Sequence, residues 1–208
     1  MKKRSWHLQL FVWGMLGCVL LVIGTLFVRS QIHRSNLPVY GPIQPFTLTN
    51  QLGRPVSSGD LAGNVWVADI IFTRCGGPCP KMTEEMSKLQ RAFAPAEPLR
   101  FVTLTTDPEF DTAPIMKSYS ERFQADANRW FFLTGSKAAI KDVAASSLKL
   151  GTQEKEQADR ETENDLFIHS TLFVLIDKAG KMRGIYESLE PGFQEKVQAD
   201  IQGLLQED

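Results

Sequence analysis

Cysteine and histidine are scarce in this sequence, which has three of each among its 208 residues. So few cysteines exclude a small scaffold held together by many disulfides. Basic residues are not in excess either, since 23 lysines and arginines face 24 acidic residues. The first 34 residues hold five basic residues and no acidic one, which leaves 18 basic against 24 acidic residues and a net charge near −6 for the remainder. An acidic domain without a basic stripe argues against nucleic acid as a partner.

Charged residues are also missing from one long stretch near the start. Leu8 to Val28 contains none, and its 21 residues match the roughly 20 that cross a bilayer as a helix. The apolar run is too long for a cleaved signal peptide, and it continues past Cys18, where a lipoprotein cleavage box would end. Basic residues ahead of the run favour a cytoplasmic N-terminus. We therefore expect a single-pass helix in the cytoplasmic (inner) membrane, with the C-terminal domain extracytoplasmic.

This prediction divides the chain into two parts. Residues 1–34 are expected to hold the cytoplasmic N-terminus, the transmembrane anchor and a juxtamembrane linker, and residues 35–208 the folded domain. Residues 35–45, which contain three prolines, are expected to form an extended spacer.

Beyond the spacer, apolar segments alternate between the periods of strands and helices. Apolar, β-rich runs that are typical of central strands lie at 65–72, 99–105 and 130–134. Helical patterns follow each of them, at 80–93, 112–123 and 136–148. A strand at 166–176, a turn into 182–186 and a helix at 191–205 complete the chain. This order predicts an α/β, thioredoxin-like fold, with a hairpin at 46–56 as an N-terminal decoration.

Two of the cysteines, Cys75 and Cys79, lie on the predicted turn between the first central strand and its helix, in the run Cys-Gly-Gly-Pro-Cys-Pro. Open α/β folds carry their sites at this edge of the sheet. Unpaired N–H groups and the positive end of the helix dipole favour thiolates there, with pKa values of about 3.5–7.5. The pair could be a structural disulfide, a redox dithiol or two ligands of a soft metal. A disulfide closing so short a loop would stabilise the fold little.

His169 is the only histidine beyond residue 34, and it lies between an acidic loop at 151–165 and a predicted strand. Two thiolates and one imidazole form a donor set that suits copper, as Cu(I) or Cu(II). Zinc with the same ligands would keep an open fourth position. Sequence spacing alone also allows a hydrogen-bonded core histidine, because a residue so far along the chain carries no geometric information.

Several stretches of the chain resemble the Sco (SenC) family of membrane-anchored copper proteins, and together they cover roughly residues 40–205. The matching stretches are Phe72 to Pro80, Asp107-Pro108 with Asp111-Thr112, Trp130 to Gly135, His169-Ser170-Thr171, and Asp177 with Gly180. The resemblance implies an extracytoplasmic, thioredoxin-like domain that binds one copper through Cys75, Cys79 and His169. It also implies a metallochaperone that assists assembly of the dinuclear copper (CuA) centre, with cytochrome c oxidase subunit II or a similar copper-site protein as the partner.

One departure from the family pattern keeps a second function open. The proline that commonly follows the first cysteine is absent here, and Pro78 precedes the second cysteine instead. The alternative is an extracytoplasmic thiol–disulfide oxidoreductase in which Cys75 attacks and Cys79 resolves, and a copper or redox sensor would use the same residues. Met82 and Met86 are expected in the core because they share a helical stripe. Asp107 and Asp111 are expected to serve turns and helix caps.

Overall fold

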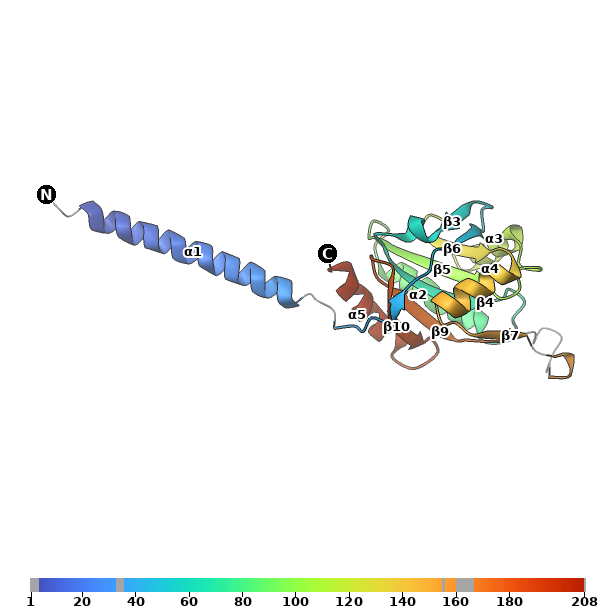
Figure 1. The fold of residues 1–208 in the computed structure, drawn as a ribbon. Helices are drawn as coiled ribbons and strands as arrows, with labels where there is room; N and C mark the ends of the chain where they lie inside the picture. The colour runs from blue at the N-terminus through green and yellow to red at the C-terminus, as the bar shows by residue number, and fades with distance from the viewer. Residues whose placement is uncertain (1–3, 33–35, 155, 160–166, 208) are drawn as a thin grey trace.

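The computed structural model describes residues 4–32, 36–154, 156–159 and 167–207. Its main sheet has eight strands in the order β1-β10-β9-β4-β5-β6-β2-β3 (Figure 1). These strands are β1 Gly41–Pro42, β2 Thr47–Asn50, β3 Pro55–Ser57, β4 Val65–Ile71, β5 Leu99–Thr105, β6 Trp130–Thr134, β9 Leu172–Ile176 and β10 Lys181–Glu187. A separate two-stranded sheet pairs β7 Thr152–Glu154 with β8 Phe167–His169.

The helical segments alternate with these strands. The α-helices are α1 Arg4–Ile32, α2 Cys79–Ala92, α3 Ala113–Arg122, α4 Lys137–Asp142 and α5 Phe193–Leu205. Shorter turns are the 3-10 segments η1 Ser58–Leu61 and η3 Gln157–Asp159, and the π-helical turn η2 Val143–Ser147, which continues α4. Ser136 caps α4 as predicted, its hydroxyl accepting a hydrogen bond from the Ala139 amide.

Three parallel strands form the centre of the sheet. β4 pairs with β5, and β5 pairs with β6, both in parallel register, while β9 runs antiparallel along the other side of β4. Every residue of β4 is buried, as expected of a strand covered on both faces. The crossover through α2 returns the chain to the same end of the sheet, so β4 and β5 run parallel. This arrangement confirms the predicted α/β fold and its hairpin decoration.

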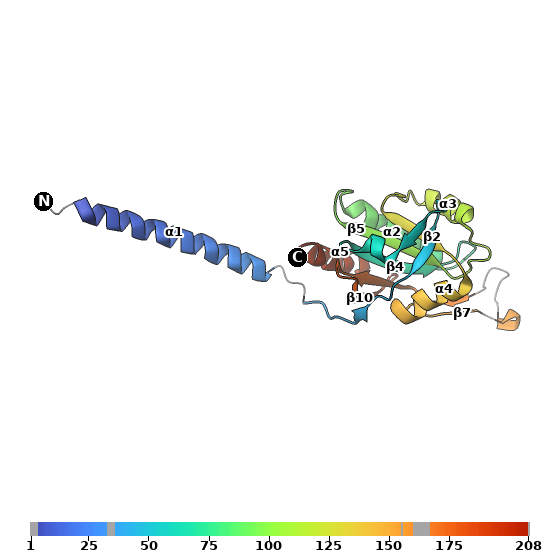
Figure 2. The same cartoon turned by 45° about the horizontal axis from the view of Figure 1, so that its top comes forward.

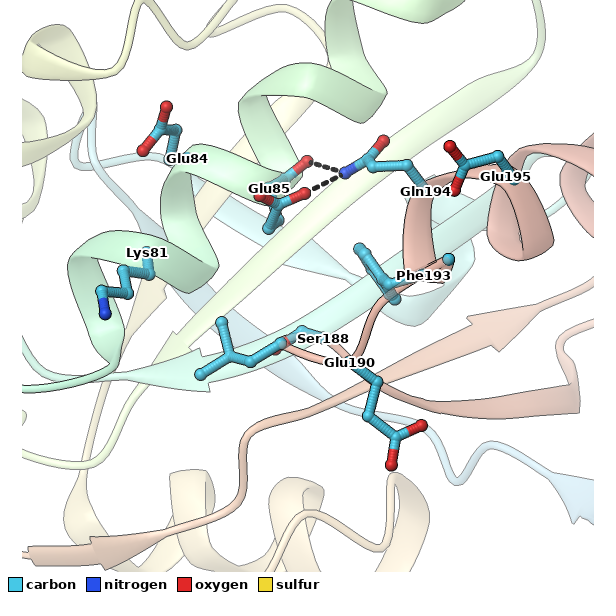
Figure 3. Close-up of a pocket in the computed structure, with 10 residues that line it drawn as sticks. Lys81, Glu84, Glu85, Ser188, Glu190, Phe193, Gln194 and Glu195 are labelled. Atoms are coloured by element: carbon cyan, nitrogen blue, oxygen red, sulfur yellow. Dashed lines mark hydrogen bonds between the residues drawn. The ribbon is translucent and has the colours of Figure 1, made fainter.

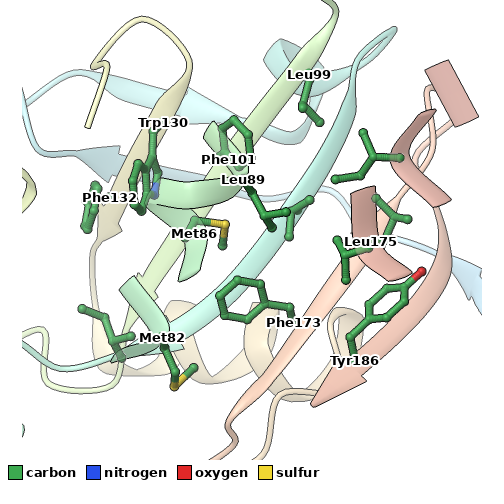
Figure 4. Close-up of a cluster of buried hydrophobic side chains, with 14 of the residues drawn as sticks. Met82, Met86, Leu89, Leu99, Phe101, Trp130, Phe132, Phe173, Leu175 and Tyr186 are labelled. Carbon is green, nitrogen blue, oxygen red and sulfur yellow. The ribbon is translucent and has the colours of Figure 1, made fainter. Parts of the chain in front are cut away.

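Each face of the sheet has its own hydrophobic cluster. On one face α2, α3 and α5 pack on side chains from β4, β5, β6, β9 and β10, and Figure 4 shows part of this cluster. Met82, Met86 and Leu89 lie fully buried in this cluster, which confirms the predicted core stripe of α2. The opposite face packs against η1, α4 and η2, with Trp66 and Ile70 of β4 at its centre. Alternate residues of β4 therefore supply the two layers.

The predicted membrane span at 8–28 falls within α1, which Figures 1 and 2 show as a long helix separate from the layered domain. Within the part of the chain that the structure describes, no helix has the combination of length and apolarity needed to cross a membrane. The span is therefore not confirmed and stays a prediction.

A buried glutamine joins the N-terminal hairpin to the central sheet. β2 pairs with β3 as predicted, through a turn in which Gly53 has a φ of 73°. The side chain of Gln51 is buried directly after β2. Its Nε2 donates to the Trp130 carbonyl oxygen at 2.8 Å, and its Oε1 accepts from the Phe132 amide at 3.0 Å. The amide side chain thus extends the hydrogen bonding between β2 and β6 beyond the last strand residue.

The expectation of an extended spacer at 35–45 is wrong for its second half. The Tyr40 amide donates to the Met182 carbonyl and the Ile43 amide to the Gly180 carbonyl, both at 2.9 Å, so this segment adds strand β1 to the sheet edge. The buried Arg183 guanidinium holds the preceding residues, because its Nε donates to the Pro38 carbonyl at 3.2 Å. The same group pairs with Asp177 at 3.0 Å. Proline-rich composition alone does not reveal this docking.

A close contact within β10 leads to a testable prediction. A Cβ atom added at Gly184 would lie 2.3 Å from the hydroxyl oxygen of Tyr186, whose ring is buried and whose hydroxyl donates to Asp200 at 2.8 Å. The ring must therefore move, and we expect Gly184→Ala to lower the free energy of unfolding by about 1–3 kcal/mol in urea titration. Gly151→Ala is the matched control, since nothing lies within 4 Å of its added Cβ. Equal stability of the two variants would contradict the prediction.

Candidate thiol and metal site

The two cysteines lie where β4 gives way to α2, at the carboxyl edge of the parallel strands, as predicted. The Cys75 amide donates to the Phe72 carbonyl at 3.2 Å, which closes the turn that follows the strand. Pro78 is the N-cap of α2, so Cys79 is its first residue and Pro80 its second, one position later than expected. Proline fits there because its missing N–H would have no partner within the helix. The sequence therefore predicts this turn almost residue by residue.

The two sulfurs have unequal environments. Cys75 is half-buried, Cys79 is fully buried, and neither forms a disulfide in this structure. The Gly77 amide donates to the Sγ of Cys75 at 3.4 Å. The two thiols are close enough to hydrogen-bond, and that contact is one of the influences on the pKa of Cys79. The pair thus offers two adjacent sulfur donors, one of them reachable from solvent.

The predicted thiolate character is wrong for Cys79. Burial raises the pKa of the Cys79 thiol far above its ordinary value, and the hydrogen bond and charge of Cys75 raise it further. A hydrogen bond from the Phe72 backbone lowers this pKa, but it does not offset the loss of solvation. Burial therefore favours the neutral thiol of Cys79 over its thiolate. The helix-terminus argument fails here because it ignores how deeply the first residue of α2 is buried.

A buried carboxylate holds the residues just before the cysteines. Asp111 accepts hydrogen bonds from the Thr73 amide at 3.1 Å, from the Thr73 hydroxyl, and from the Thr105 hydroxyl at 2.5 Å. Burial raises the pKa of Asp111 above its ordinary value, although the bonds from Thr105 and Thr73 lower it. The structure also gives Thr112, the N-cap of α3, no side-chain capping bond. Asp111 thus ties the cysteine turn to β5 rather than capping a helix, which corrects the expectation.

Asp107 makes the second connection between the same two loops. Its carboxylate pairs with the Arg74 guanidinium at 2.5 Å, and the Arg74 side chain lies over the ring of Phe110 at 3.9 Å from its centroid. The residues on both sides of the pairing belong to the two turns that follow β4 and β5. Sequence analysis singled out Asp107 and Asp111 but missed their partners Thr73 and Arg74. The predicted pairing of the two parallel strands could have indicated these contacts, because the turns that follow adjacent parallel strands meet at the same edge of the sheet.

Beneath the cysteines lies a buried polar group of side chains. The Thr83 hydroxyl donates to the Cys79 carbonyl at 2.9 Å and lies 3.0 Å from the Tyr119 hydroxyl. Burial raises the pKa of Tyr119, and the nearby Cys79 and Asp69 contribute to the rise. Asp69 itself is fully buried in β4. In the sequence, this buried polar group was indicated only by Asp69, the single charged residue within an otherwise apolar strand.

The position of His169 is described only through its backbone. It ends β8, where it pairs with Thr152, and the next residue donates its amide to the Gly151 carbonyl at 3.1 Å. In the register of β9 with β4, which pairs Val174 with Ala68, the start of β9 lies at the end of β4 that leads to the cysteines. The topology thus brings the backbone near 169 to the same sheet edge as Cys75 and Cys79. The His169 side chain lies outside the described part of the structure, as does much of the acidic loop at 151–165.

Among the described residues there is no cluster of three or more histidine, cysteine or acidic side chains arranged for a metal ion. The side chains of Met82 and Met86 belong to the core cluster on one face of the sheet, as predicted. The donor set that the described residues supply therefore consists of the two cysteine sulfurs. Adjacent sulfur ligands fit a soft metal ion such as Cu(I) better than a hard one such as Mg²⁺.

A groove of about 430 Å³ lies between α2 and the segment joining β10 to α5 (Figure 3). Carboxylates of Glu84, Glu85, Glu190 and Glu195 surround it, with Lys81 as the single cation among the residues lining it. Gln194 bridges its two walls by donating to Glu85 Oε2 at 2.7 Å. The groove is acidic and contains neither cysteine.

Comparison with known proteins identifies relatives over most of the chain. The family model described as SCO1/SenC matches residues 40–206. The SCO1 protein homolog of Bacillus subtilis is 32% identical over 166 residues, covering 79% of this chain and 83% of that protein.

Solved structures share the fold as well. One is BsSco, described as a member of the Sco family of cytochrome c oxidase assembly proteins in which a disulfide switch was identified. It is 31% identical with a TM-score of 0.68, covering 83% of this chain and 97% of BsSco. Another is Bradyrhizobium japonicum ScoI with copper bound, which is 25% identical with a TM-score of 0.65, covering 77% of this chain and 98% of ScoI.

Proposed function

The chain belongs to the SCO1/SenC family, and from that premise we propose that it is a copper metallochaperone assisting assembly of the CuA centre of cytochrome c oxidase. Its partner is then subunit II or a similar copper-site protein. Two relatives support the proposal: BsSco belongs to a family of oxidase assembly proteins, and Bradyrhizobium japonicum ScoI has been solved with copper bound. Copper is cargo in this function, taken up and passed on.

The observation that carries the proposal is the pair of adjacent sulfurs on a turn at the sheet edge. Cys75 and Cys79 would be two ligands of one copper ion, and His169 would be the third. β9 begins at the end of β4 that leads to the cysteines, and this register supports His169 as the third ligand. The half-buried Cys75 is the sulfur that an incoming ligand can reach. Copper would bind Cys79 as a thiolate, so uptake releases the proton that the buried thiol carries.

Location at a membrane belongs to the same proposal. Residues 8–28 would anchor the chain in the cytoplasmic membrane and hold residues 35–208 on the extracytoplasmic side. The absence of charge from this stretch and the basic residues ahead of it support the orientation. An extracytoplasmic compartment is oxidising, so Cys75 and Cys79 would have to be reduced there before they could bind metal.

The test of the proposal is a copper titration of the reduced full chain. We expect one copper per chain, with thiolate-to-copper charge-transfer absorption. His169→Ala should weaken copper binding by at least tenfold. Removing a residue that only orients a metal ligand typically lowers metal affinity about 10–100-fold, and removing the ligand itself should lower it at least as much. The control variant is His33→Ala, which lies outside residues 40–206 matched by the family model. Unchanged copper affinity in His169→Ala would contradict the three-ligand site.

A second function is favoured by the unequal exposure of the two sulfurs. A thiol–disulfide oxidoreductase needs one accessible attacking thiol and one buried resolving thiol, and Cys75 and Cys79 match these roles. Rapid turnover of protein disulfides by the metal-free chain, unaffected by His169→Ala, would establish this function in place of the metallochaperone.

A further inference from the structure

A second groove, of about 380 Å³, lies directly beside the cysteine turn. Thr73 and Arg74 form one wall, immediately before Cys75, and residues of α3 with the turn before it form the other. The residues that matter here are Arg74, Phe110, Ile115, Tyr119 and Arg122. Because Thr73 and Arg74 lead straight into Cys75, a molecule seated in this groove lies next to the reachable sulfur.

The charge of this groove is opposite to that of the domain around it. Two guanidinium groups line it, although residues 35–208 carry a net charge near −6. Arg74 gives one nitrogen to Asp107, and its side chain keeps 37% of its surface exposed. Arg122 is exposed and lies over the Tyr119 ring, 5.5 Å from its centroid, and makes no ion pair within the described part of the chain. The groove therefore has guanidinium groups available to a carboxylate.

Between the two arginines the groove is apolar. Phe110 keeps 38% of its surface exposed, an unusual degree for a phenylalanine beside a buried core. Ile115 and Tyr119 of α3 complete this floor. A surface that combines exposed aromatic area with arginine has the composition of a protein-binding patch rather than of ordinary solvated surface.

We propose that this groove docks an extended, acidic segment of the partner protein, with a carboxylate between Arg74 and Arg122 and an apolar side chain on Phe110. The proposal rests on the proposed function, because the docked segment is what presents the partner's sulfur or metal ligands to Cys75. The acidic groove between α2 and α5 repels the same segment (Figure 3). The two grooves thus favour one placement of an acidic partner on the molecule.

The reaction of Cys75 with activated peptides tests this docking. Two peptides of equal length carry one cysteine as a mixed disulfide with thionitrobenzoate, next to leucine, and differ only in having glutamates or lysines around it. The Cys75 thiol loses its proton to solvent and its sulfur attacks the peptide sulfur. The peptide–thionitrobenzoate bond breaks, a Cys75–peptide disulfide forms, and the thionitrobenzoate thiolate leaves as the chromophore. Stopped-flow absorbance on the reduced full chain carrying Cys18→Ser gives the rate constant of this exchange, since Cys18 is a further exposed free thiol.

We expect the acidic peptide to react about tenfold faster than the basic one, and raised salt to reduce the preference. Arg122→Glu should abolish the preference and Arg122→Gln should reduce it. Lys117→Glu is the matched control, because it makes the same charge change on α3 at a residue that does not line the groove and should keep the preference. Equal rates for the two peptides, or an equal effect of Lys117→Glu, would overturn the proposal.

Copper titration of the same variants separates this inference from the proposed function. Arg122→Glu should bind copper as the unmodified chain does while losing its peptide preference. A chain that shows the preference but binds no copper would refute the metallochaperone and leave the docking groove in place. A chain that binds copper but reacts equally fast with the two peptides would refute the docking groove and leave the metallochaperone in place.

Discussion

Replacing Asp111 by alanine is expected to lower the free energy of unfolding by about 3 kcal/mol and to weaken copper binding about tenfold. The carboxylate accepts three hydrogen bonds from Thr73 and Thr105, and its removal leaves buried donors without a partner. Thr73 is two residues before Cys75, so the turn that carries the first sulfur loses its attachment to β5. A site that is no longer held in place binds its metal less tightly.

Urea titration and copper titration of Asp111→Ala measure the two effects, and Asp142→Ala is the control. Asp142 is an exposed aspartate whose contact is a single hydrogen bond from Ser146 at 2.9 Å. The attachment described here would be refuted if Asp111→Ala matched the control in both measurements.

The raised pKa of Asp111 adds a pH dependence of defined sign. Because the pKa is higher in the folded chain than the ordinary value of 3.8, protonation of this carboxyl favours folding. Its contribution is fully present below the ordinary pKa and is lost as pH rises through the folded pKa. Lowering the pH from about 7 toward 4 should therefore stabilise the natural chain relative to Asp111→Asn. A constant stability difference between the two chains over this range would contradict the raised pKa.

Arg129→Met should be the most destabilising substitution outside the site, at about 3–5 kcal/mol. The buried guanidinium donates to three carbonyls at the end of α2, those of Gln90 at 2.6 Å, Phe93 at 3.1 Å and Ala94 at 3.3 Å. The last carbonyls of a helix lack partners within it, so one side chain here does the work of a C-cap. Without Arg129 the buried Gln90 and Phe93 carbonyls lose this donor, while the Ala94 carbonyl keeps its hydrogen bond from the Glu97 amide at 3.1 Å.

Equilibrium unfolding in urea measures this loss, and Arg91→Met controls for removing an arginine from the same region. Arg91 is exposed, and its guanidinium contacts a single hydroxyl, that of Ser87. Arg129→Lys should recover part of the stability, since an ammonium group can reach fewer of the three acceptors. A loss below 1 kcal/mol in Arg129→Met would show that water replaces the guanidinium at the end of α2.

Periodicity and turn chemistry were enough to predict the order of strands and helices in this chain. β4, β5 and β6 lie within a residue or two of the predicted apolar runs, and α2 buries the predicted stripe of Met82, Met86 and Leu89. These predictions are correct because the residues that each element buries are the apolar residues of its own sequence. The location of Cys75 and Cys79 followed for the same reason, from the strand–turn–helix order.

What the sequence did not reveal depends on contacts between distant segments. The raised pKa of Cys79 follows from how the core closes over the start of α2, and the partners of Asp107 and Asp111 follow from which strands are neighbours. The docking of residues 40–43 on β10 has no local pattern, because a two-residue strand leaves no periodicity. Each of these features requires knowing what lies opposite a residue in space.

The short strand β1 also limits how far the domain can travel. The Arg183 guanidinium donates a hydrogen bond to the Leu37 carbonyl, so only residues 33–36 link the end of α1 to the fixed part of the domain. Five residue steps span about 18 Å at full extension. Leu37 therefore stays within this distance of the end of α1, and under the proposed membrane anchoring a protein that receives copper would have to approach the domain at the membrane surface.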